Sequence, residues 1–135
     1  SIGIEICNYG PLTKKGDEYF NYVNGKVPAD QVVDLGYDFR GFRYYHAYTS
    51  AQIEVTKNLV VKLGKDYTID LSKGMQTLLN GPVLMPEGLD TLGQQKWLNM
   101  QGYIGGVWTH TNVRSDKTDL SPQPAVIEMI KSLGE

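Results

Sequence analysis

The chain has 135 residues, enough for one domain, and 41% of them are hydrophobic, which is ordinary for a globular protein and argues against disorder. The formal net charge is only −2 and the basic residues are scattered among acids, so a nucleic-acid-binding surface is not expected. No apolar run approaches the roughly 20 residues of a membrane-spanning helix, and the single Cys7 excludes an internal disulfide.

Residues 1–8 alternate between apolar and small or polar side chains. Ile2, Ile4 and Ile6 fall on one side, and the other side carries Glu5 among small residues, so the pattern predicts a strand with one apolar face. The chain opens inside this pattern, without an initiator Met or a basic and apolar leader. We therefore expect a processed or truncated N-terminus.

Residues 18–23 predict a short strand, and the Asn24-Gly25 pair that follows is a hairpin signal. The next stretch is rich in tyrosine and leaves two structures open for residues 39–46, a loop or a short strand. A helix is expected to begin at Thr49, because Thr49 and Gln52 fit a capping box.

Gly64 is expected to end this helix, and residues 72–79 predict a second, shorter one. Residues 80–102 are rich in Gly, Pro and Asn and predict a long surface loop with one helical turn. Residues 103–111 predict a buried strand whose glycines allow close approach of another segment.

Ser121 and Pro122 predict the start of a last helix, with Ser121 as its cap and Pro122 in its first turn. The apolar residues of this helix recur at helical spacing and predict its buried face. They are Val126, Ile127, Ile130 and Leu133.

His110 and Asp119 are nine residues apart, and Lys117 lies two residues before Asp119. Imidazole nitrogen and carboxylate oxygen are good zinc ligands, and an ammonium can stabilise a developing oxyanion. This combination suggests metal-assisted hydrolysis. The alternative is a strand-end histidine and a loop aspartate that never meet, beside a solvated lysine.

Three further features have two interpretations each. Glu5 is either a general base for a zinc-bound water or a solvent-facing strand carboxylate. His46 is either a third metal ligand or, as we favour, a partly buried histidine that hydrogen-bonds locally. The aromatic and arginine residues of 37–48 either line a groove for a sugar or peptide or pack at the rim of the core. Cys7 shares a predicted strand face with Glu5, but a nucleophilic role would need a paired base.

Three separated segments occur in the order that a known family shows. They are the opening Ser-Ile-Gly-Ile-Glu-Ile, the stretch from Phe39-Arg-Gly-Phe-Arg-Tyr-Tyr to Gln52-Ile53, and His110 through Lys117-Thr118-Asp119. Together they resemble the zinc-dependent N-acetylmuramoyl-L-alanine amidases, a family that includes peptidoglycan recognition proteins and amidase-type phage lysozymes. The resemblance implies an α/β domain with a mixed central β-sheet flanked by helices.

The resemblance also implies roles for four residues. Glu5 matches the catalytic carboxylate, His110 and Asp119 match two zinc (Zn2+) ligands, and Lys117 matches the lysine that supports the oxyanion. The family's first zinc ligand lies on a strand that would precede residue 1, and His46 does not match it. We therefore expect residues 1–135 to form a single amidase-like domain that lacks its N-terminal part and binds zinc weakly.

The implied function is hydrolysis of the peptidoglycan amide between N-acetylmuramic acid and L-alanine of the stem peptide. The expected partners are peptidoglycan or muropeptides and a separate chain or fragment that supplies the missing ligand, with no nucleic acid and no membrane span. The expected setting is extracellular, cell-wall associated or phage-encoded. Two alternatives are a binding module that holds muropeptide without cleaving it and a structural component of a larger assembly such as a phage particle.

Overall fold

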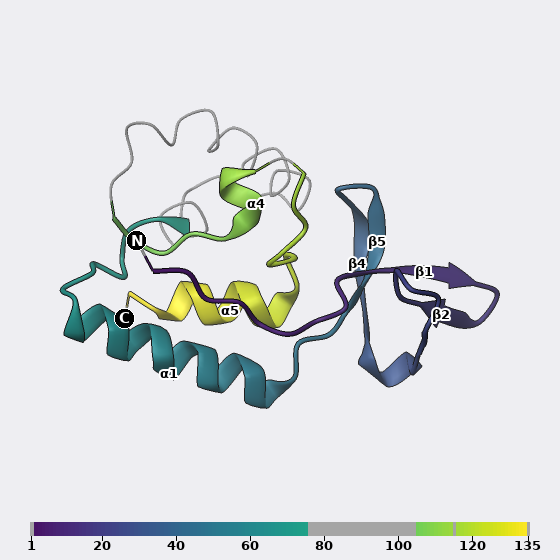
Figure 1. The fold of residues 1–135 in the computed structure, drawn as a ribbon, viewed down its shortest axis with the longest axis horizontal. Helices are drawn as coiled ribbons and strands as arrows, with labels where there is room; N and C mark the ends of the chain where they lie inside the picture. Colours follow the sequence, from purple (N-terminus) through teal and green to yellow (C-terminus); the bar gives the residue numbers. More distant parts are fainter. Residues whose placement is uncertain (1, 76–104, 115, 135) are drawn as a thin grey trace.

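The computed structural model describes residues 2–75, 105–114 and 116–134. An antiparallel sheet forms one end of the molecule, and the helices α1 (Ser50–Asp66) and α5 (Pro124–Ser132) lie side by side at the other (Figure 1). We call these the sheet end and the helical end. The mixture of helices and strands expected from the sequence is confirmed, but the described sheet is antiparallel throughout and lies beside the helices rather than between them.

Five strands make the sheet, in the order β3-β2-β1-β5-β4. Their bounds are β1 (Pro11–Lys15), β2 (Glu18–Phe20), β3 (Lys26–Val27), β4 (Val32–Phe39) and β5 (Phe42–His46). A 3-10 turn, η1 (Ala29–Gln31), leads into β4. Asn24, at a φ of 60°, lies in the turn between β2 and β3, so the predicted hairpin is confirmed. The stretch 39–46, left open from sequence, is a hairpin turn followed by a strand.

The β4–β5 turn consists of Arg40 and Gly41, whose φ angles of 53° and 88° are both positive. Two such residues are what a two-residue type I′ turn requires, and glycine adopts the conformation without strain. Tyr45 is fully buried and its hydroxyl donates to the Phe39 carbonyl at 2.6 Å, which ties the two strands together beside the turn. Arg40 therefore projects from a well-fixed base.

Helix α1 begins as the sequence predicts. The Thr49 hydroxyl accepts from the Gln52 amide at 3.0 Å, and the Gln52 side chain accepts from the Thr49 amide at 2.9 Å, which is a complete capping box. The expected end at Gly64 is wrong, because the helix continues to Asp66. A Cβ at Gly64 would lie 3.0 Å from Leu71, so the glycine serves close packing instead.

The main core lies at the helical end. Helix α5 starts after Gln123, two residues later than predicted, with Pro124 in its first turn. Its buried face agrees with the prediction, apart from Ile127, which is only partly buried, and the addition of Met129. The buried members of this core are Tyr48, Met75, Val126, Met129, Ile130 and Leu133.

Two predicted strands are wrong. Residues 2–8 are extended but form no β-ladder with any described residue. In 103–111, the described part forms only an isolated bridge between Val107 and Gly74, and His110 begins the one-turn helix α4 (His110–Val113). Gly105 and Gly106, with φ of 84° and 86°, interrupt an extended backbone there.

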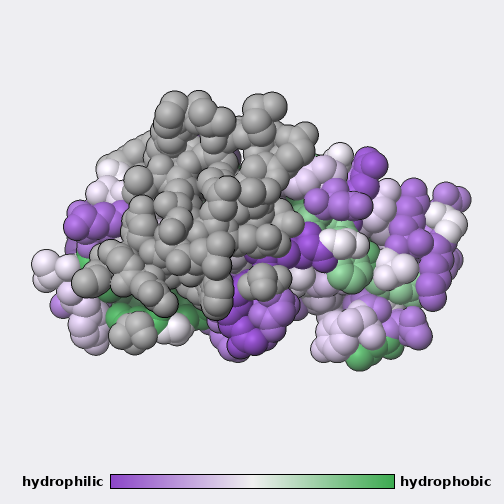
Figure 2. Space-filling model, turned by 90° about the horizontal axis from the view of Figure 1, so that it is seen from above, coloured by the Kyte–Doolittle hydropathy of each residue, from purple (hydrophilic) through white to green (hydrophobic). Residues whose placement is uncertain are grey.

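The predicted second helix fails over residues 72–74, and its remainder, like the 80–102 loop, lies almost wholly outside the described residues. No helix within 2–75, 105–114 and 116–134 is long and apolar enough to cross a membrane. On the face drawn in Figure 2, hydrophobic residues of the sheet end form small patches among hydrophilic ones.

Candidate functional site

The structure brings His110 and Asp119 together. His110 is the first residue of α4, and Asp119 follows the loop after this helix. The His110 Nδ1 atom lies 2.7 Å from Asp119 Oδ2, and the two side chains are 48% and 55% exposed. The main chain supports the contact, since the Thr111 amide donates to the Asp119 carbonyl at 3.1 Å. The alternative in which the two side chains never meet is therefore wrong.

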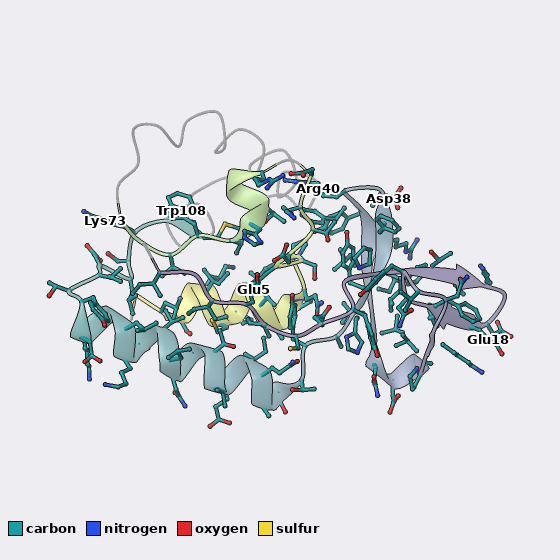
Figure 3. All side chains as sticks on the ribbon, in the orientation of Figure 1. Glu5, Glu18, Asp38, Arg40, Lys73 and Trp108 are labelled. Atoms are coloured by element: carbon teal, nitrogen blue, oxygen red, sulfur yellow. The ribbon has the colours of Figure 1, made fainter. Side chains whose placement is uncertain are left out.

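Arg40 reaches this segment from the sheet end (Figure 3). Its Nη1 donates to the carbonyls of Arg114 at 2.9 Å and Lys117 at 3.0 Å, and its Nη2 donates to the Thr111 carbonyl at 2.9 Å. One guanidinium thus gathers three carbonyls from α4 and the loop that follows it. Charged donors make hydrogen bonds roughly twice as strong as neutral ones.

Lys117 belongs to the same loop and is partly buried. Its carbonyl accepts from Arg40, and its amide donates to the Arg114 carbonyl at 3.4 Å. Arg114 also pairs with Asp116 at 2.7 Å, and this hydrogen bonding lowers the pKa of the Asp116 carboxyl. The loop between His110 and Asp119 is therefore fixed mainly through its main chain.

Tyr48 and Gln123 are buried and contact each other, and Tyr48 is close enough to Asp119 to feel its charge. Burial, and then the negative charge of Asp119, raise the pKa of the Tyr48 phenol, so this hydroxyl stays protonated at physiological pH. The Gln123 side chain is 2% exposed, accepts from the Tyr48 amide at 3.3 Å, and donates to the His46 carbonyl and the Ser121 hydroxyl, each at 2.8 Å. Gln123 thereby joins the site-bearing segment to the end of β5.

Glu5 is exposed on the extended N-terminal segment (Figure 3). That segment is anchored by Gln52, which donates to the Cys7 carbonyl at 2.8 Å, and by Asn8, which donates to the His46 carbonyl at 2.9 Å. These anchors hold the main chain near Glu5, and among the described residues its carboxylate makes no hydrogen bond or ion pair with His110 or Asp119. Cys7 is an exposed free thiol.

His46 makes local contacts, as we favoured. Its Nδ1 accepts from the Tyr9 amide at 3.2 Å, its Nε2 lies 3.3 Å from Gln31 Oε1, and its ring lies 5.0 Å from that of Tyr9. An imidazole occupied in this way at both nitrogens has no lone pair free for a metal. The interpretation of His46 as a third ligand is therefore not supported.

The donor chemistry of His110 and Asp119 suits zinc, since both types are common zinc ligands. The fit is partial, because the described residues contain no cluster of three or more His, Cys, Asp or Glu side chains. The same contact also suits an imidazole oriented by a carboxylate through Nδ1, with Nε2 left to bind a metal or a proton. In either arrangement His110 keeps a ring nitrogen that can bind a metal.

The sequence did not predict the structural roles of Arg40 and Gln123. Their partners lie 71 to 77 residues away along the chain. The one local signal for Arg40 is that it precedes a glycine between two aromatic residues, which is compatible with a tight turn. Comparison with protein-family models, with curated proteins and with solved structures found no match.

Proposed function

We propose that this chain acts on peptidoglycan as a zinc-dependent amidase of the N-acetylmuramoyl-L-alanine type. The observation that carries the proposal is the 2.7 Å contact between His110 Nδ1 and Asp119 Oδ2, the two residues that the resemblance assigns to zinc. Support also comes from Lys117, which lies in the loop between them and is held there by Arg40.

In this proposal His110 and Asp119 hold the metal, and a third protein ligand comes from outside the described residues. Zinc would supply Lewis acidity and a water molecule of lowered pKa. Two side chains of this protein would supply the remaining catalytic roles. The Lys117 ammonium donates to the oxygen that gains negative charge during amide cleavage, and Glu5 accepts a proton from the attacking water.

A second candidate is a module that binds peptidoglycan without cleaving it. It is favoured by the pairing of two zinc donors rather than three among the described residues. A catalytic zinc site usually has three protein ligands, and a site with fewer holds zinc less tightly. In this candidate Lys117 and Glu5 contact the muropeptide instead of taking part in a reaction.

Zinc binding by the full chain tests the site directly. Equilibrium dialysis compares the wild type with His110→Ala and Asp119→Asn, and His46→Gln serves as the matched control because both His46 ring nitrogens already contact Tyr9 and Gln31. We expect the zinc Kd to rise by more than about 100-fold in the first two variants, beyond what loss of a supporting residue causes, and to stay unchanged in the control. Equal zinc binding by wild type and His110→Ala would refute the site.

Incubation with cell-wall sacculi then separates the two candidates. Zinc-dependent release of new amino termini supports the amidase, and its loss in Lys117→Ala with zinc affinity retained would assign the oxyanion role. Sedimentation of the chain with sacculi without such release, with and without added zinc, favours the binding module.

A further inference from the structure

Arg40 makes a connection that no described catalytic role explains. It stands at the tip of the β4–β5 hairpin, and its guanidinium donates to the carbonyls of Thr111, Arg114 and Lys117 at 2.9 to 3.0 Å. These carbonyls bracket most of the chain between His110 and Asp119. The contacts therefore span the part of the molecule on which the proposed site depends.

Both sides of this connection are fixed. On the hairpin side, the turn geometry, the Tyr45 hydroxyl and the stacking of the guanidinium 5.4 Å from the centre of the buried Phe39 ring restrict the Arg40 side chain. On the loop side, the Thr111 amide donates to the Asp119 carbonyl, and the Arg114 amide donates to the His110 carbonyl. A shift of the three gripped carbonyls would move the main chain at both ends of the pair.

The chemistry of the contact favours arginine. Carbonyls at the end of a helical turn and in the loop after it carry partial negative charge, which a cation neutralises. A guanidinium presents several N–H donors in a rigid plane, whereas a lysine ammonium is a single compact charge on a flexible stem. Arg43 offers an internal comparison, because it lies on the same hairpin and pairs with Asp34 at 2.7 Å instead.

We propose that Arg40 is the positioning residue of this site: by gripping the carbonyls of Thr111, Arg114 and Lys117 it sets the contact between His110 and Asp119. The residue acts through the loop and touches neither substrate nor metal. The part of the inference that concerns metal affinity rests on the proposed function. The part that concerns the His110–Asp119 contact does not.

The test compares Arg40→Ala and Arg40→Lys with Arg43→Ala in the full chain. The main readout is the ¹⁵N spectrum of the imidazole rings, which reports the hydrogen bond at His110 Nδ1. The chain has two histidines, so His46 supplies an internal reference in every spectrum. Amide exchange at Thr111 and Lys117, zinc dialysis and circular dichroism complete the set.

In Arg40→Ala we expect the His110 ring signals to move while those of His46 stay, and exchange at Thr111 and Lys117 to rise about tenfold or more. The zinc Kd should rise about 10–100-fold, as for other residues that orient ligands. Arg40→Lys should restore part of each effect, and Arg43→Ala should show none. Should Arg40→Ala lose its helical signal, the Arg40→Lys comparison carries the test.

Unchanged His110 signals in the folded Arg40 variants would overturn the inference, as would equal effects in Arg43→Ala. The outcomes also separate this inference from the proposed function. A wild type that binds no zinc, with His110 signals that still respond to Arg40, removes the function and keeps the positioning role. A wild type that binds zinc through His110, with signals indifferent to Arg40, does the reverse.

Discussion

Apart from the β1–β5 pair, the strands of the sheet end pair with their neighbours in sequence, whereas the segment that carries His110 and Asp119 is supported by contacts over long sequence distances. In the sheet, β1 pairs with β2 and β4 with β5 across short turns, and the buried Asn21 side chain accepts from the amides of Val23 and Gly25. The contacts that tie the helical end to the sheet end join residues far apart in sequence. Arg40 and Thr111 are separated by 71 residues, and Gln123 and His46 by 77.

The candidate site therefore lies in the part of the molecule that depends more on long-range contacts. Short loops lose little entropy when they close, so hairpin contacts form with few other requirements. The loop between His110 and Asp119 instead contacts the distant β4–β5 hairpin through Arg40, and Gln123 ties the start of α5 to the end of β5. Variants that break long-range contacts should therefore destabilise the helical end more than matched variants destabilise the sheet end.

Gly74→Ala should have the largest effect. Gly74 has a φ of +88°, and an added Cβ would lie 2.3 Å from the Val107 carbonyl oxygen and 2.7 Å from its nitrogen. Figure 3 labels Lys73 and Trp108 on the two segments that meet there. We expect the free energy of unfolding to fall by about 3–5 kcal/mol, from backbone strain together with overpacking, as measured by urea denaturation.

Gly36→Ala is the matched control for this variant. Gly36 has a similar φ of +81°, but nothing lies within 4 Å of an added Cβ. Its cost should be limited to the backbone conformation, about 1–2 kcal/mol. Equal losses in the two variants would show that the contact between the Gly74 and Val107 segments adds nothing to stability.

Gln123→Ala should have the next largest effect. The change leaves the buried Tyr48 amide without its acceptor and removes donors to the His46 carbonyl and the Ser121 hydroxyl. An unsatisfied buried group together with a small cavity should cost about 2–4 kcal/mol in thermal or urea unfolding.

Asn21→Ala tests the same kind of loss within one turn. Asn21 is also buried, at 7% exposure, but its side chain accepts only from amides two and four residues away. Water can reach that turn, so the loss should be about 1 kcal/mol. A greater loss in Asn21→Ala than in Gln123→Ala would contradict the contrast between local and long-range support.

The features that sequence predicted correctly are those decided by neighbouring residues. The capping box of Thr49 and Gln52, the Asn24-Gly25 hairpin and the apolar stripe of α5 each depend on a few consecutive positions. The failures come from tertiary context. The Ile2-to-Ile6 alternation is typical of a strand, but a strand also needs a partner, and residues 2–8 have none among the described residues.

The candidate site follows the same rule. The residue types of His110 and Asp119 indicated metal chemistry, but their spacing of nine left open whether the two side chains meet. In the structure, the helical turn α4 stands where a strand was expected, and the two side chains meet. Arg40 contacts carbonyls of this segment that lie 71 to 77 residues away along the chain. Nothing local in the sequence specifies such a contact.

The smallest expected effect on stability comes from His46, which lies where the sheet end and the helical end meet. His46 is the last residue of β5, and its carbonyl accepts from both Asn8 and Gln123. Burial lowers the pKa of its ring below the ordinary 6.5. The ring holds the Tyr9 amide through Nδ1, which is an acceptor only when the imidazole is neutral. Protonation would turn this contact into two opposed donors.

The sign of the pH dependence follows from the lowered pKa. Because the unfolded chain takes up the proton more readily, the contribution of His46 is complete above pH 6.5 and is lost as the pH falls below that value through the folded-state pKa. We expect the melting temperature to fall between about pH 7.5 and pH 5.5, and the slope to become shallower in His46→Gln. Because the ring is partly exposed, this effect on stability should be smaller than those of Gly74→Ala and Gln123→Ala. His110→Gln is the control, and a slope that depends on His110 rather than on His46 would contradict the assignment.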